Sequence, residues 1–106
     1  MHLALRALDA DKNEEAITFL KRALVLAPTD GRLHFLLGAV HAEIGLDERA
    51  IAELSRAIEL APELLTAHFQ LGTLFLRRGD VDRAAQAWRP LDALDRNHPL
   101  ARFTSA

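Results

Sequence analysis

The stretch "ERAIAELSRAIELAP", Glu48–Pro62, decides the fold, because the chain contains the same pattern twice. The segment "EEAITFLKRALVLAP", Glu14–Pro28, precedes it by 34 residues and keeps the proline in the same place. At the same spacing, "LHFLLG" at Leu33–Gly38 returns as "AHFQLG" at Ala67–Gly72. Agreement between separate segments on one spacing indicates a tandem structural repeat.

The middle copy of the repeat contains two helical patterns. Apolar residues recur at helical spacing from Leu33 to Ile44, and Gly45 then ends the first helix. The second pattern begins at Asp47 and ends before Pro62, which cannot continue a helix. The sequence therefore predicts an antiparallel pair of helices in each copy.

The same spacing divides the whole chain into repeats. In the first repeat, the second helix is expected at about Glu14–Ala27, after a short piece of a first helix. In the third repeat, Pro90 cannot donate a hydrogen bond to the Gln86 carbonyl, so the last helix should kink or end there. We expect a single domain with a partial repeat at 1–30, full repeats at 31–64 and 65–98, and the start of a fourth repeat or a capping helix at 99–106.

The repeats resemble the tetratricopeptide repeat family, whose signature is Trp-x2-Leu-Gly-x2-Tyr, then Ala-x3-Phe and Pro, on a period of about 34 residues. Small residues let the two helices of a hairpin approach closely, and neighbouring hairpins bury what one hairpin leaves exposed. The resemblance implies an all-α fold, a right-handed superhelix of tandem antiparallel helical hairpins. The matching residues are His34, Leu37, Gly38, His41, Ala50, Leu54 and Pro62 in the second repeat, and His68, Leu71, Gly72, Phe75, Ala84 and Trp88 in the third.

Composition and motifs argue against several kinds of chemistry. The chain has no cysteine, which excludes disulfides and thiolate metal sites. Its net charge is −2 and charges of both signs are mixed without a basic stripe, which argues against nucleic-acid binding. No apolar run is long enough to span a membrane, and no nucleophile or phosphate-binding motif occurs. We therefore expect a non-catalytic protein without cofactors, and the expected location is the cytoplasm.

Three histidines need a separate explanation. His34 and His68 stand where the family has an aromatic residue, and His41 stands one repeat before Phe75. We interpret these histidines as partly buried packing residues. A metal site would need several converging ligands, and no carboxylate is placed to complete one, so we expect no metal.

The first helix of each hairpin is expected to line a concave face. Phe35, Phe69 and Phe103 recur at one repeat spacing and would form an apolar ladder there, which marks either a partner site or a surface that another helix covers. Family members that hold the C-terminal carboxylate of heat-shock chaperones use lysine, asparagine and arginine in this groove, and the matching places here lack them. The candidate contact residues are Arg32, Phe35, Ala39, Glu43, Thr66, Phe69, Thr73, Leu76, Arg77 and Phe103.

These observations favour a scaffold that binds a peptide or a helix of a protein partner in an apolar concave groove. The alternative is a regulatory or oligomerising segment of a larger bacterial enzyme or secretion or assembly protein, and self-association is a third hypothesis. Because the sequence starts inside one helical pattern and stops early in another, we interpret it as a segment of a longer array; a small protein closed by a capping helix is the alternative. Replacing Phe35 and Phe69 together by alanine is expected to abolish partner capture and to leave thermal stability nearly unchanged.

Overall fold

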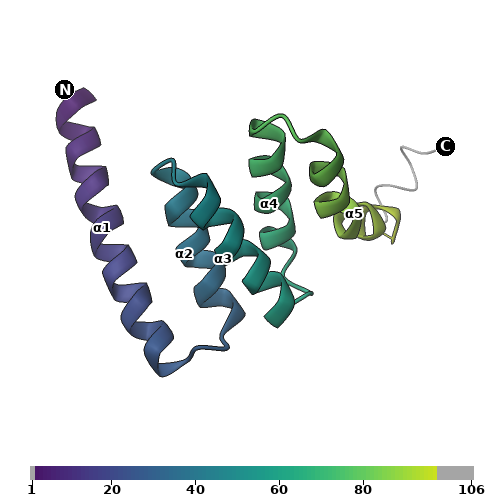
Figure 1. Cartoon of the computed structure of the whole chain (residues 1–106), viewed down its shortest axis with the longest axis horizontal. Coiled ribbons are helices and arrows are strands. Elements are labelled where there is room, and N and C mark those ends of the chain that lie inside the picture. Colours follow the sequence, from purple (N-terminus) through teal and green to yellow (C-terminus); the bar gives the residue numbers. More distant parts are fainter. Residues whose placement is uncertain (1, 98–106) are drawn as a thin grey trace.

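The computed structural model describes the backbone of residues 2–97 and the side chains of residues 12–91. Within that range the chain forms helices joined by short turns and contains no strand. Neighbouring helices along the chain lie side by side, and α2 with α3 and α4 with α5 form two hairpins (Figure 1). The all-α prediction of stacked helical hairpins is confirmed. The helices are α1 (His2–Leu26), α2 (Gly31–Glu43), α3 (Asp47–Leu60), α4 (Leu65–Arg77) and α5 (Val81–Asn97).

The turns inside the two hairpins have the same design. Gly45 and Gly79 adopt the left-handed backbone conformation, with φ values of 88° and 83°. This conformation suits glycine because it lacks a Cβ, and it ends the preceding helix. In each turn the next backbone N–H bonds back to a helix carbonyl, from Leu46 to His41 and one repeat later from Asp80 to Phe75, each at 2.8 Å. The sequence signal for both turns therefore corresponds to a repeated hydrogen-bond pattern.

The first repeat departs from this design. The sequence predicted a short first helix followed by a second one at about Glu14–Ala27, but α1 is one continuous helix over His2–Leu26. This prediction was wrong. The place of Gly45 and Gly79 is held by Asp11 in the first repeat. Because the Cβ of Asp11 makes the left-handed conformation costly, the feature that reverses the chain in the other repeats is missing.

Helix α5 continues through Pro90 and reaches Asn97. Of the two predicted outcomes, an early end at the proline therefore does not occur. The direction of α5 changes along its length (Figure 1). A bend is the expected response of a helix to a proline that removes one backbone hydrogen bond and crowds the preceding turn.

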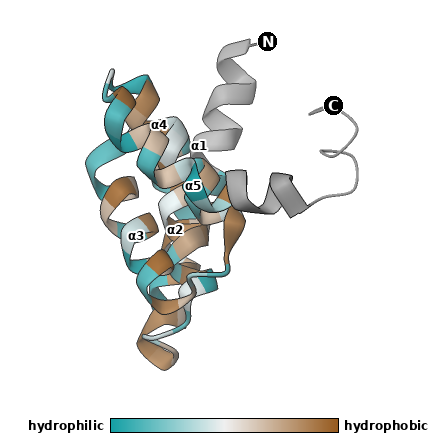
Figure 2. Cartoon of the chain, turned by 90° about the vertical axis from the view of Figure 1, so that its right-hand side faces the viewer, coloured by the Kyte–Doolittle hydropathy of each residue, from teal (hydrophilic) through white to brown (hydrophobic). Residues whose placement is uncertain are grey.

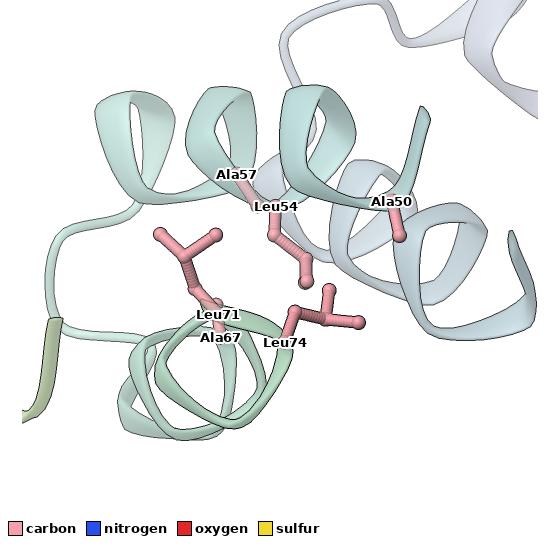
Figure 3. Close-up of a cluster of buried hydrophobic side chains, with 6 residues drawn as sticks. All are labelled: Ala50, Leu54, Ala57, Ala67, Leu71 and Leu74. Atoms are coloured by element: carbon pink, nitrogen blue, oxygen red, sulfur yellow. The ribbon is translucent and has the colours of Figure 1, made fainter. Parts of the chain in front are cut away.

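The core of the molecule joins the two hairpins to each other. It lies between α3 and α4, where Leu54 and Ala57 of α3 face Leu71 and Leu74 of α4 (Figure 3). Leu54 is completely buried. Partly buried side chains from α2 and α5 pack around this cluster, Phe35 and Ala87 among them. The α3–α4 contact therefore sets the positions of α2 and α4, which are the first helices of the two hairpins.

Two glycines allow the helices within each hairpin to approach closely. A Cβ at Gly38 would lie 2.9 Å from Leu54 Cγ, and a Cβ at Gly72 would lie 2.1 Å from Trp88 Nε1. Both distances are shorter than van der Waals contact. The interpretation of Gly38 as a close-packing position is confirmed.

The described helices carry both hydrophilic and hydrophobic residues along their length (Figure 2). Within the described range, no helix combines the length and the apolar character that crossing a bilayer requires.

Candidate functional site

A groove of about 400 Å³ lies between α2 and α4. Helix α3 packs against both of these helices, whereas α2 and α4 touch each other only slightly. Small side chains at Ala39 and Ala42 keep the α2 wall shallow. Most of the lining is apolar. The lining residues are Leu36, Ala39, Val40, Ala42 and Glu43 of α2, and Phe69, Gln70, Thr73, Leu74 and Arg77 of α4.

The lining follows one helical stripe that is repeated in both helices. Leu36, Val40 and Glu43 lie on one face of α2 at the spacing i, i+4, i+7, and Gln70, Leu74 and Arg77 occupy the same places one repeat later in α4. The predicted stripe ran through Phe35 and Phe69 and shares Glu43 and Arg77 with this one. The groove therefore overlaps the predicted face in part and extends beyond it to Leu36, Val40, Gln70 and Leu74.

Two polar side chains of the groove find partners inside the chain. The Thr73 hydroxyl donates to the Phe69 carbonyl at 2.9 Å. The Arg77 guanidinium forms an ion pair with Asp47 at the start of α3 and lies 3.5 Å from the Ala42 carbonyl. These contacts connect the end of α4 to the preceding hairpin, so the charge of Arg77 is already neutralised within the molecule.

The other two polar side chains of the groove lack such partners. Glu43 is exposed at the end of α2, and none of the ion pairs among residues 12–91 involves its carboxylate. The side-chain oxygen of Gln70 is buried and has no hydrogen-bond partner in the described part of the chain. An unpaired buried acceptor is costly to maintain, so a donor from a bound molecule would stabilise it.

The structure brings some of the predicted contact residues together and leaves others apart. Arg32, Thr66 and Leu76 are exposed on the surfaces of α2 and α4 but do not line the groove. Phe103 lies outside the described residues. Reasoning from the sequence missed Leu36, Val40, Gln70 and Leu74; their recurrence at one repeat spacing was the signal that could have found them. The predicted residues that do line the groove are Ala39, Glu43, Phe69, Thr73 and Arg77.

The two phenylalanines of the predicted ladder have different environments. Phe35 is partly buried and packs against the core cluster between α3 and α4. Phe69 is 56% exposed, lines the groove, and stacks on Trp88 with ring centroids 6.4 Å apart. The Trp88 indole N–H donates to the Phe69 carbonyl at 3.1 Å, which fixes this pair. Phe35 is therefore a packing residue, and Phe69 is the phenylalanine that faces the groove.

The histidines at the signature positions connect helices to turns. His34 Nε2 lies 2.9 Å from the Pro28 carbonyl oxygen, and His68 Nε2 lies 2.9 Å from that of Pro62, one repeat later. His34 Nδ1 also lies 3.0 Å from a carboxylate oxygen of Glu53 on α3. These contacts explain both residues as structural elements.

His41 is the most deeply buried histidine among the described side chains, with 4% of its surface exposed. Burial lowers its pKa from the usual value, because the charged ring would lose its hydration; Glu53 opposes this shift, while Arg49 and Lys21 add to it. Within residues 12–91, no group of three histidine or carboxylate side chains is arranged to hold a metal ion.

Comparison with known proteins adds to this description. A family model described as tetratricopeptide repeat matches residues 2–64. No curated protein matches the sequence significantly. The structure is similar to that of MamA from Desulfovibrio magneticus RS-1, with 27% identity and a TM-score of 0.76 over 87% of this chain and 52% of that one. The chain thus spans about half the length of the MamA structures that it matches.

Two further structures share the fold. The type III secretion translocator chaperone SycD from Yersinia enterocolitica is 23% identical, with a TM-score of 0.76 over 98% of this chain and 72% of that one. PcrH, solved in complex with the chaperone-binding region of PopD, is 24% identical, with a TM-score of 0.75 over 95% of this chain and 76% of that one. At these identities the similarity concerns the fold alone.

Proposed function

The chain belongs to the tetratricopeptide repeat family, and on that premise we propose that it binds a peptide or a helix of another protein in the groove between α2 and α4, without catalysis. The observation that carries this proposal is the exposed apolar wall of the groove. Leu36 is 45% exposed and Phe69 is 56% exposed, although both are large apolar side chains. A contiguous apolar surface of this kind is typical of an interaction site.

The chemistry of the lining agrees with binding rather than catalysis. Its polar groups are one carboxylate, one amide, one hydroxyl and one guanidinium, and the hydroxyl of Thr73 already donates to a backbone carbonyl. Among the residues whose side chains are described, no histidine lines the groove to activate a nucleophile. Support at the level of the fold comes from PcrH, which holds a region of another protein, PopD.

The test uses two leucines that have similar exposure but lie in different places. Leu36 lines the groove, whereas Leu46 lies in the turn between α2 and α3 and does not line it. Replacing a leucine by glutamine keeps the size of the side chain and adds no charge. If the partner buries Leu36, Leu36→Gln should weaken binding about tenfold, since burial of a leucine contributes roughly 1.5–3 kcal/mol.

The measurement is affinity capture with the tagged protein, followed by quantification of the captured proteins by mass spectrometry. Leu36→Gln should reduce capture, and Leu46→Gln should leave it close to that of the wild type. Circular dichroism establishes that both variants keep their helices. Equal capture by wild type and Leu36→Gln would contradict binding in this groove.

Self-association is a second candidate function, supported by a separate observation. Phe35 and Ala42 pack against the core cluster, whereas their equivalents one repeat later, Phe69 and Leu76, are exposed. A second copy could cover this face as α4 covers the corresponding face of the preceding hairpin. Sedimentation velocity at low and high concentration tests this candidate, and a strict monomer at both concentrations would exclude it.

A further inference from the structure

The polar groups of the groove also indicate which kind of segment fits it. Resting on the proposed function, we infer that the groove takes a peptide segment that places a lysine or arginine beside an apolar side chain, with Glu43 as the partner of the basic residue. The charges of the groove, its unpaired hydrogen-bonding group and its apolar wall all favour such a segment.

The charges of the groove leave one carboxylate without a counterion. Arg77 is paired with Asp47, so these two charges cancel within the molecule. Glu43 lines the same groove and takes part in none of the ion pairs found among residues 12–91. The groove therefore presents one net negative charge. An anionic segment would be repelled, whereas a lysine or arginine would find an unused partner.

The unpaired hydrogen-bonding group points to a donor as well. The buried side-chain oxygen of Gln70 accepts no hydrogen bond in the described part of the chain. The carboxylate of Glu43 is also only an acceptor when ionised. Both acceptors, the buried oxygen of Gln70 and the exposed carboxylate of Glu43, therefore lack a donor within the described part of the chain. A peptide backbone offers N–H groups, and the side chains of lysine and arginine carry donors and no acceptor.

The apolar wall of the groove indicates which kind of side chain should stand next to the basic residue of the peptide. Leu36 and Phe69 expose about half of their surfaces on the two sides of the groove, and Ala39 leaves room between the helices. An apolar side chain placed there would shield both walls from water. The same contact would lower the local dielectric constant around Glu43, which strengthens its attraction to a cation.

The experiment begins with a random peptide library displayed on phage and selected against the wild-type protein. Enriched peptides are synthesised with a fluorescent label, in their selected form and with each basic residue replaced by norleucine. Affinities are measured by fluorescence anisotropy at low and high salt concentration. The protein variants are Glu43→Gln, the groove variant Leu36→Gln, and Glu63→Gln, which removes the same charge from an exposed position in the turn between α3 and α4.

The expected result is a preference of up to about fivefold for the basic peptide over its norleucine analogue, which is the range measured for an exposed ion pair. This preference should decrease at high salt, disappear in Glu43→Gln and persist in Glu63→Gln.

The possible failures are distinguishable. If Leu36→Gln weakens binding but the basic residue makes no difference, or makes the same difference in Glu43→Gln, the inference is overturned while the proposed function stands. If no peptide is enriched, or if Leu36→Gln binds as tightly as the wild type, the inference is overturned together with the proposed binding in this groove.

Discussion

Phe35 and Phe69 provide a sharp test of the structure, because they are the same residue type at the same repeat position. The repeat spacing alone makes the two positions equivalent and predicts that both residues can be replaced by alanine with little loss of stability. The structure distinguishes them: Phe35 packs against the core cluster, and Phe69 is more than half exposed and stacks on Trp88. We therefore expect Phe35→Ala and Phe69→Ala to have different effects on the free energy of unfolding.

The size of each effect follows from the contacts that are lost. Phe69 buries less than half of its surface, so its truncation should cost about 1–2 kcal/mol, including the stack on Trp88. Truncation of Phe35, which is partly buried against the core cluster, leaves a cavity there, for which roughly 3 kcal/mol is the usual cost. A difference of 1–2 kcal/mol corresponds to about 5–15 °C in melting temperature for a domain of this size.

The assay is thermal and urea unfolding of the two single variants, followed by far-ultraviolet circular dichroism. Phe35→Ala should melt well below Phe69→Ala, and Phe69→Ala should be the variant that loses more peptide binding. The double variant should lose stability, contrary to the expectation from the sequence. Equal melting temperatures for the two single variants, or a lower one for Phe69→Ala, would refute the packing argument.

Three further predictions concern the turns and the hairpin contacts. Gly72→Ala should lower the free energy of unfolding by about 2 kcal/mol, because its Cβ would overlap the indole of Trp88, and an unchanged urea midpoint would contradict this. Gly45→Ala should cost roughly 1–2 kcal/mol through backbone strain alone, since its φ is 88° and a Cβ there has open space; a smaller loss in urea unfolding would show that the turn relaxes. Burial lowers the pKa of His41, so the neutral ring stabilises the fold above about pH 6.5, and this contribution is lost as the pH falls. His41→Phe should therefore lose less stability than the wild type between neutral and mildly acidic pH, and equal losses in urea unfolding at both values would contradict that assignment.

Much of the fold could be predicted because it depends on local signals that recur. Gly45 and Gly79 permit the left-handed turns, and Pro62 ends a helix, so both hairpins can be read from the sequence. The first repeat was mispredicted because the spacing suggested a turn that the local residues do not support. Asp11 stands at the turn position, and the helix continues through it. The repeat spacing therefore predicts which positions correspond to one another. Whether corresponding positions adopt the same backbone conformation depends on the residue found at each.

The groove could be predicted only in part, because its exact face depends on tertiary packing. On an isolated helix the stripe through Phe35 and the stripe through Leu36 are equally plausible, since both contain apolar residues at helical spacing. The choice is made by the contact between α3 and α4, which buries Phe35 beside the core and turns Leu36 toward the open side. The ion pair of Arg77 with Asp47 likewise joins residues of two hairpins, and helical periodicity within one helix does not specify it.

Comparison of the second repeat with the third distinguishes the positions that hold the fold together from those that line the groove. At several buried positions the second and third repeats carry the same residues, as in Leu37 and Leu71 or Ala50 and Ala84. Close packing leaves little choice at such places, because a changed volume is felt at once. In the groove stripe the equivalent pairs are Leu36 with Gln70, Val40 with Leu74, and Glu43 with Arg77. Leu36, Glu43 and Arg77 are exposed, so differences at these positions alter the groove without disturbing the hairpins, whereas Leu74 also belongs to the core. The unlike pairs supply the two acceptors without donors, Gln70 and Glu43, and the cation that Asp47 neutralises, Arg77. The carboxylate of Glu43 therefore remains as a net negative charge on an apolar surface.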